Sequence, residues 1–144
     1  SDLVVTMDAE SVMLQARFAD EDLAKGNWHG TLHGVPVTIK DSIEVAGMVC
    51  TAGTQGLASY VPNRDATVVS RLKNQGAIVL GKTNLPELCV AFESDNLLFG
   101  STRDPYGASR TAGGRSGGGA DGVRARVRCD GMQKVWTTHR ATRA

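Results

Sequence analysis

The sequence predicts one α/β domain over residues 1–120, followed by a basic segment of different character over residues 121–144. Two short apolar runs, 35–39 and 77–81, are typical of buried strands. The segments 12–24 and 65–76 place apolar residues at three- and four-residue steps, as amphipathic helices do. Strand, helix and strand then follow one another, which is the order of α/β layer folds.

The first helix is expected over residues 12–24. Val12, Ala16, Ala19 and Leu23 form one apolar stripe, and Gly26 is expected to end the helix. A turn-like stretch follows, and then the β-branched run VPVTI predicts a strand that is buried on both faces.

The second helix is expected between an acidic N-cap and a glycine C-cap. Asp65 can accept the first backbone N–H groups, and Val68, Val69 and Leu72 share a face. Gly76 suits the left-handed position after the last turn.

The chain then enters the strand at 77–81 and, we expect, a further helix. Asn84 is the predicted cap of that helix and Pro86 lies in its predicted first turn. From Phe99 to Gly118 the residues are mainly Gly, Ser, Asp and Pro in place of any apolar period, so we expect loop throughout and no strand.

Composition narrows the class of protein. Hydrophobic residues make up 41% and charged residues 22% of the 144, which disfavours disordered and membrane classes. No run approaches the roughly 18 apolar residues of a membrane span, and the start lacks the pattern of a secretory leader, so we expect a cytoplasmic protein. Cys50, Cys89 and Cys129 form no CxxC pair, so we expect reduced, mostly buried thiols.

The charge balance changes sign at about residue 120. Residues 1–120 carry 10 basic and 13 acidic side chains, and residues 121–144 carry 6 and 2. This change fits a reading-frame change or an incomplete gene product, and we expect the segment to pack irregularly. A nucleic-acid partner is disfavoured, because the basic residues are spread out around a single aromatic residue, Trp136.

Three consecutive blocks of the sequence resemble the amidase signature family. They are LHGVPVTIKDSIEVAGMVCTAGT, NRDATVVSRLKNQGAIVLGKTNLPE and FGSTRDPYGASRTAGGRSGGG, and the resemblance covers about residues 12–120. It implies part of a mixed-sheet, helix-covered α/β fold. It also implies hydrolysis of a small-molecule carboxamide or ester through an acyl-enzyme, by a Ser-Ser-Lys triad without metal or cofactor.

The resemblance assigns the base to Lys40, and Asp41 is expected to orient the local backbone and the lysine. A free lysine titrates near about 10.4, so a lysine base requires burial or neighbouring donors. The position of the relay serine in the family's G-G-S-S-G-G pattern is occupied by Arg115, and Ser116 matches only the supporting serine. Arginine stays protonated and cannot relay a proton at neutral pH.

The resemblance also indicates substrate-binding positions. Cys89 and Ala91 fall where relatives line the pocket, although packing in the core is an equal interpretation for Cys89. Gly113, Gly114 and Gly117 would let backbone N–H groups approach a ligand closely.

The family's D-I-G-G-S-type turn, which carries the nucleophile, does not occur in these 144 residues, so we expect catalysis by this chain to be impaired. One alternative is a non-catalytic remnant or binding module. Another is an esterase that uses Ser116 of GRSGG with His139, although the nucleophile elbow requires a preceding strand. The glycine loop lacks the ending of a P-loop, but a backbone nest for an anion stays open. Homo-oligomerisation also stays open.

His29 and His33 are four residues apart, but Gly30 separates them in a segment with no helical pattern. A metal-binding pair is therefore disfavoured, and we expect ordinary loop histidines.

Overall fold

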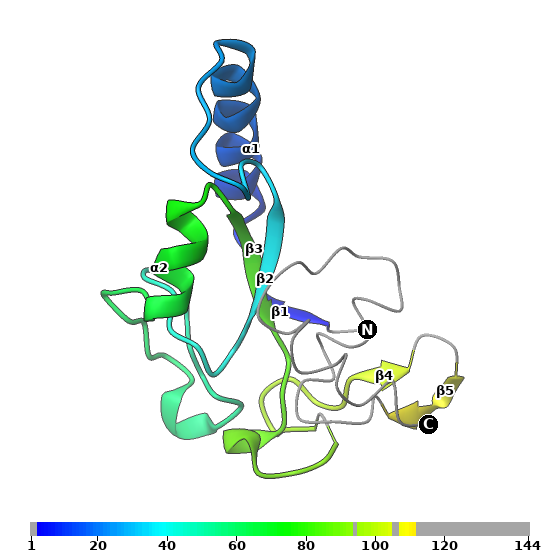
Figure 1. Cartoon of the computed structure of the whole chain (residues 1–144). Helices are drawn as coiled ribbons and strands as arrows, with labels where there is room; N and C mark the ends of the chain where they lie inside the picture. The colour runs from blue at the N-terminus through cyan, green and yellow to red at the C-terminus, as the bar shows by residue number, and fades with distance from the viewer. Residues whose placement is uncertain (1–2, 94, 105–106, 112–144) are drawn as a thin grey trace.

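The computed structural model describes residues 3–93, 95–104 and 107–111, and its centre is a small mixed sheet. The strands β1 (Val4–Thr6), β3 (Ile78–Thr83) and β2 (Pro36–Lys40) lie in the order β1-β3-β2 (Figure 1). β1 runs antiparallel to β3, and β2 runs parallel to β3. With two helices beside this sheet, the predicted α/β class with a mixed sheet is confirmed.

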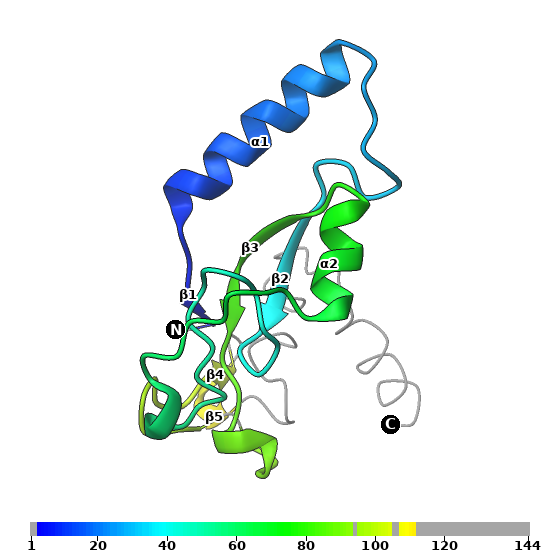
Figure 2. The same ribbon diagram turned by 90° about the vertical axis from the view of Figure 1, so that its left-hand side faces the viewer.

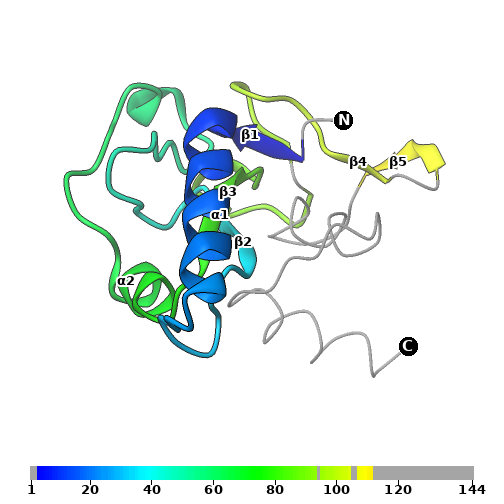
Figure 3. The same ribbon diagram turned by 90° about the horizontal axis from the view of Figure 1, so that it is seen from above.

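Helix α1 (Ala9–Ala24) starts three residues before the predicted Val12, because the Asp8 carboxylate caps it by accepting the backbone N–H of Ser11 at 3.0 Å. Gly26 follows its end with φ +78°, as predicted. Viewed from above, α1 crosses over β3 (Figure 3). No residue of α1 is fully buried, and the predicted stripe is only partly covered, with Leu23 44% exposed.

The core lies between the parallel strands and helix α2 (Thr67–Asn74), which lies beside β2 in Figure 2. Its buried members are Val37, Ile39, Val45, Val69, Ala77 and Val79. The predicted apolar face of α2 is confirmed, since Val69 is fully buried and Val68 and Leu72 pack against the same cluster. Full burial of a side chain such as that of Val69 contributes roughly 1.5–3 kcal/mol.

The predicted N-cap of α2 is wrong. Ala66 occupies the cap and makes no side-chain cap bond, because Asp65 is engaged elsewhere. The Asp65 carboxylate accepts the Ala46 backbone N–H at 2.7 Å and the Lys73 ammonium at 2.9 Å. Gly76, with φ +86°, does take the left-handed position after Gln75, as predicted.

Gly81 allows β1 to approach β3. A Cβ at this position would collide with the backbone carbonyl oxygen of Thr6. The third strand of the sheet therefore depends on a missing side chain in β3.

The predicted helix after Asn84 is wrong. Only a single 3₁₀ turn, η2 (Glu87–Cys89), forms there, with Pro86 before it, and a similar turn, η1 (Gln55–Leu57), lies earlier in the chain. Leu88 and Cys89 have φ values of +48° and +60°, which interrupt any α-helical path. Asn84 caps no helix, because its amide binds a different segment.

The expectation of loop throughout residues 99–118 is also wrong. Strands β4 (Arg103–Asp104) and β5 (Gly107–Thr111) form an antiparallel pair with Asp104 opposite Gly107. This pair and η2 both lie beyond the carboxyl ends of β2 and β3 (Figures 1 and 2). Hairpin pairing satisfies backbone groups without an apolar pattern, which is why composition alone predicted loop.

Within the described ranges, none of the helices has the length and apolar character needed to cross a membrane.

Candidate active site

Lys40 is the last residue of β2 and lies opposite Thr83, the last residue of β3. Because β2 and β3 are parallel, their carboxyl ends meet at one edge of the sheet, the edge where open α/β sheets hold ligands. Lys40 is partly buried, whereas the next residue, Asp41, is 0% exposed. The strand end therefore presents a lysine next to a fully desolvated carboxylate.

The Asp41 carboxylate is held by Thr51. Its Oδ2 accepts the Thr51 backbone N–H at 3.2 Å and a very short hydrogen bond from the Thr51 hydroxyl. The Asp41 backbone N–H donates to the carbonyl of Thr83 at 3.1 Å, and its own carbonyl accepts the N–H of Ala52 at 3.1 Å. Asp41 thus orients the local backbone, as the sequence predicted for it.

The lysine that pairs with Asp41 is Lys82 of β3, which sequence reasoning missed. Lys82 Nζ lies 3.3 Å from Asp41 Oδ1, and both side chains are essentially inaccessible to solvent. The same ammonium donates to the carbonyl of Val49 at 3.5 Å. Oδ1 accepts no aligned hydrogen bond from the described residues, so its contact with Lys82 is an ion pair rather than a hydrogen bond.

A signal for this pair does exist in the sequence. Lys82 follows the apolar strand run directly, and a lysine that continues a buried strand requires a carboxylate partner. Asp41, at the end of the neighbouring parallel strand, is in position to supply it.

A second buried polar cluster begins one residue after β3. Asn84 Oδ1 accepts the Asn96 amide at 2.7 Å, and Asn84 Nδ2 donates to the Thr102 hydroxyl at 2.9 Å and to the Gly100 carbonyl at 3.2 Å. Asn84, Asn96 and Thr102 are all buried. These bonds tie the segment 96–102, which leads into β4, to the end of β3.

The segment with Cys89 lies against the loop that follows Asp41. The Leu88 backbone N–H donates to the carbonyl of Ala52 at 2.8 Å, and Ala52, Leu88 and Cys89 all have positive φ. A Cβ at Gly53 would lie 3.2 Å from the Glu87 Cα. Left-handed non-glycine residues are strained and often occur at functional sites. Cys89 is partly buried and Ala91 is exposed.

Cys50 lies beside Asp41, and its thiol donates to the Asp41 carbonyl at 3.2 Å. Burial raises the pKa of this thiol above its ordinary value, so it is a structural, protonated cysteine. Cys50 and Cys89 are both free, as expected, while Cys129 lies outside the described residues.

The remaining predicted site residues also lie outside the described residues. They are the glycine-loop residues Gly113, Gly114, Arg115, Ser116 and Gly117, together with His139.

His29 and His33 lie in the loop after α1 and stack on one another, with ring centroids 5.3 Å apart. His29 contacts the Asp22 carboxylate at 2.7 Å, and His33 contacts the Ala19 carbonyl at 2.8 Å. These contacts dock the loop on α1.

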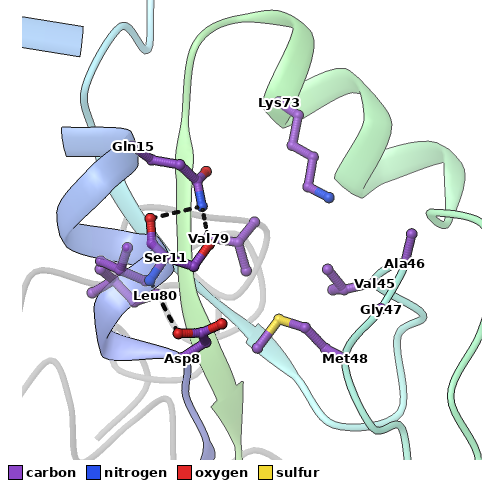
Figure 4. Close-up of a pocket in the computed structure, with 11 residues that line it drawn as sticks. Asp8, Ser11, Gln15, Val45, Ala46, Gly47, Met48, Lys73, Val79 and Leu80 are labelled. Atoms are coloured by element: carbon purple, nitrogen blue, oxygen red, sulfur yellow. Dashed lines mark hydrogen bonds between the residues drawn. The ribbon is translucent and has the colours of Figure 1, made fainter. Parts of the chain in front are cut away.

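Two hollows of about 210 and 460 Å³ lie on the side of the sheet bordered by α1 and α2. Figure 4 shows the smaller one, where Ser11 and Gln15 of α1 face Lys73 of α2 above Val79. Lys40 lines neither hollow, so we place the candidate site at the strand ends, where the buried charges gather.

The geometry thus defines an α/β domain with a polar cluster at the carboxyl edge of a mixed sheet. The model of the Amidase family matches residues 2–128, and the chain belongs to this family.

Individual relatives agree with this assignment. A glutamyl-tRNA(Gln) amidotransferase subunit of Carboxydothermus hydrogenoformans is 44% identical over 121 residues, which are 84% of this chain and 25% of that protein. The native peptide amidase of Stenotrophomonas maltophilia superposes with a TM-score of 0.79 at 35% identity, over 86% of this chain and 26% of its own. A 6-aminohexanoate cyclic dimer hydrolase superposes with a TM-score of 0.75 at 28% identity, over 88% of this chain and 25% of the hydrolase.

The chain therefore spans about a quarter of the length of these relatives.

Proposed function

We propose that this chain forms the base-bearing part of an amidase-type active site that hydrolyses a small-molecule carboxamide or ester, with Lys40 as the base. The position of Lys40 at the carboxyl edge of the sheet, next to a buried Asp41 that is paired with Thr51 and Lys82, supports this most directly. Relatives named as amidases or as an amidotransferase subunit support the same reaction class. The cytoplasmic location expected from the sequence stays a prediction.

The proposed chemistry is nucleophilic. A serine hydroxyl attacks the carbonyl carbon, its proton passes through a relay serine to the Lys40 amine, and the leaving amine takes that proton as the C–N bond breaks. Water then hydrolyses the acyl-enzyme, with Lys40 again accepting the proton. Arg115 at the relay position interrupts this path, because a guanidinium has no proton acceptor at neutral pH.

A chimera tests the base and the relay separately. Residues 2–120 of this chain replace the matching segment of the Stenotrophomonas maltophilia peptide amidase, so that the rest of that enzyme supplies the proposed nucleophile, and the chimera is assayed on the substrate of that enzyme. We expect the chimera to be nearly inactive and Arg115→Ser to restore hydrolysis. Adding Lys40→Ala to Arg115→Ser should lower kcat/KM again by on the order of 10⁴ or more.

Lys25 supplies the matched control, because it is an exposed lysine at the end of α1. The chimera with Arg115→Ser and Lys25→Ala should keep its rate. Equal rates with and without Lys40 would remove Lys40 from the mechanism.

A Ser116 esterase is the second candidate, and one observation favours it. A nucleophile elbow requires a strand before the serine, and β5 ends at Thr111, shortly before GRSGG. The sequence-based reason for dismissing this elbow was the absence of a strand, and that reason is wrong. A non-catalytic remnant or binding module is the third interpretation, favoured by Arg115.

A further inference from the structure

The buried ion pair between Asp41 and Lys82 is not explained by the stability of the fold. Burying two charges costs several kcal/mol each, and replacing such a pair by apolar residues is often neutral or stabilising. The two side chains are 0% and 1% exposed, and the pair lies one residue from the candidate base.

We propose that Lys82 is a positioning residue for Lys40: by pairing with Asp41, it fixes the strand end and keeps the Asp41 carboxylate from acting as the counter-ion of Lys40. This inference rests on the proposed function, in which Lys40 must be able to give up its proton.

The contacts of Asp41 occupy the carboxylate that is nearest to Lys40 in the sequence. The Asp41 carboxylate accepts two hydrogen bonds from Thr51 and forms an ion pair with the Lys82 ammonium. The Asp41 backbone is hydrogen-bonded to Thr83 and Ala52. Lys40 and Asp41 are consecutive residues, so a change in the charge of the Asp41 carboxylate acts within one residue of the Lys40 amine. In the part of the chain that the structure describes, Lys40 has no ion pair.

Three other titratable groups of the described segments after β2 and β3 have surroundings that the structure defines. Glu44 accepts the Tyr60 hydroxyl at 2.7 Å, the Cys50 thiol is buried and protonated, and Glu87 is exposed on η2. Removal of Lys82 takes away the cation that pairs with Asp41, the residue next to Lys40. Without it, the uncompensated carboxylate of Asp41 would hold Lys40 as an ammonium ion.

Competitive acetylation tests this directly. The intact chain is treated with a trace of acetic anhydride at a series of pH values, and mass spectrometry reads the acetylated fraction of Lys40 relative to Lys25. We expect Lys82→Met to move the Lys40 profile to higher pH, lowering acetylation on its rising limb by on the order of tenfold, one unit of the titration. The double variant Asp41→Asn with Lys82→Met should return the profile to that of the wild type, because it removes both charges.

Two controls separate this effect from loss of structure. Lys73→Met removes a lysine of α2 that pairs with Asp65, and this change should leave the acetylation profile of Lys40 unchanged. If circular dichroism shows that Lys82→Met is unfolded, the test is repeated with Lys82→Gln. The glutamine amide can still donate a hydrogen bond to Asp41, but it carries no charge and leaves the carboxylate charge uncompensated.

A folded Lys82 variant with the wild-type Lys40 profile would overturn the proposal. A shift that persists in the double variant would also overturn it, because the cause would then not be the Asp41 charge. Acetylation reads the Lys40 amine without any turnover, whereas the chimera reads catalysis. An active Lys40→Ala chimera would therefore end the proposed function and leave the acetylation result interpretable by itself.

Discussion

Two consecutive residues at the end of β2 have opposite surroundings. Lys40 is partly accessible, whereas Asp41 is fully buried, with Oδ2 hydrogen-bonded to Thr51 and Oδ1 in an ion pair with Lys82. The difference arises because Thr51 and Lys82 both approach Asp41 from neighbouring segments. In our proposal, this difference leaves Lys40 available as the base while Asp41 holds the strand end.

Thr51 is predicted to be an essential partner of Asp41. Replacing it by valine keeps the shape but removes the hydroxyl donor from a buried carboxylate, which should lower the free energy of unfolding by about 1–3 kcal/mol. Urea unfolding followed by circular dichroism measures this. Thr54→Val is the control, because no side-chain cap bond forms at Thr54. Equal stability of the two variants would contradict the importance of this bond.

The isolated chain is predicted to hydrolyse simple amides and activated esters no faster than its Lys40→Ala variant. Arg115→Ser alone should not rescue it, because no D-I-G-G-S-type turn occurs in the sequence to supply the attacking oxygen. Loss of nucleophile or base commonly costs on the order of 10⁶ in rate.

One result would reverse this expectation. If a fluorophosphonate labels Ser116 in the wild-type chain and the labelling disappears in Lys40→Ala, Ser116 and Lys40 form a working Ser–Lys pair.

At the scale of elements, α2 is held to the loop after β2 by Asp65. Its carboxylate is 17% exposed and joins the Ala46 N–H to the Lys73 ammonium of the last helical turn. Burial alone would raise the pKa of Asp65, but the hydrogen bonds from Lys73 and Ala46 and the charge of Lys73 outweigh it and lower the pKa below 3.8.

Asp65→Asn should therefore destabilise the chain by about 1 kcal/mol at neutral pH, a value discounted because Lys73 is partly exposed. A carboxylate with a lowered pKa in the folded state stabilises it above the unfolded pKa, and this stabilisation is lost as the pH falls through the folded value. The difference in the free energy of unfolding between the wild type and Asp65→Asn should thus shrink as the pH falls below about 3.8.

Urea unfolding at pH 7 and near pH 3 measures this difference. Asp20→Asn on the exposed face of α1 is the control. If the difference in the free energy of unfolding did not depend on pH, the charge of the Asp65 carboxylate would not contribute to stability.

The attachment of β1 is predicted to depend on Gly81. Gly81→Ala places a methyl group against the Thr6 carbonyl, so β1 must move or leave the sheet, at a cost of about 1–3 kcal/mol. Hydrogen exchange of the β1 amides, together with urea unfolding, would detect this. Gly56→Ala, where no atom lies closer than 4.0 Å to the added Cβ, is the matched control. Unchanged exchange in β1 would contradict the prediction.

For the molecule as a whole, large apolar side chains remain uncovered among the described residues. On α1, Met13, Leu14 and Phe18 are 52–57% exposed, and after η2, Val90, Phe92 and Leu97 are 67–80% exposed. Extended exposed apolar surface promotes association in water. We therefore expect the chain to have marginal stability and to self-associate.

Sedimentation velocity over a range of concentrations tests this prediction. Leu14→Glu with Phe18→Glu should shift the distribution towards monomer, whereas the charge change Arg17→Glu on the same helix should have little effect. A monodisperse wild-type monomer with a sharp two-state unfolding transition would show that the expectation is wrong.

Local patterns in the sequence determined the elements whose cause is local. The apolar runs predicted β2 and β3, the stripe of Val68, Val69 and Leu72 predicted α2, and Gly26 and Gly76 marked two helix ends, because periodicity and positive φ are properties of short segments. The three motif blocks likewise predicted the family.

Tertiary structure decided which partner each polar side chain takes. Asp65 and Asn84 looked like helix caps. Asp65 is held instead by Ala46 of the loop after β2 and by Lys73 at the far end of α2, and Asn84 is held by Asn96. The pair of Asp41 with Lys82 depends on the parallel pairing of β2 with β3, which brings together residues 41 positions apart in the chain. A buried charge must find a partner wherever the fold provides one, and no local pattern records that choice.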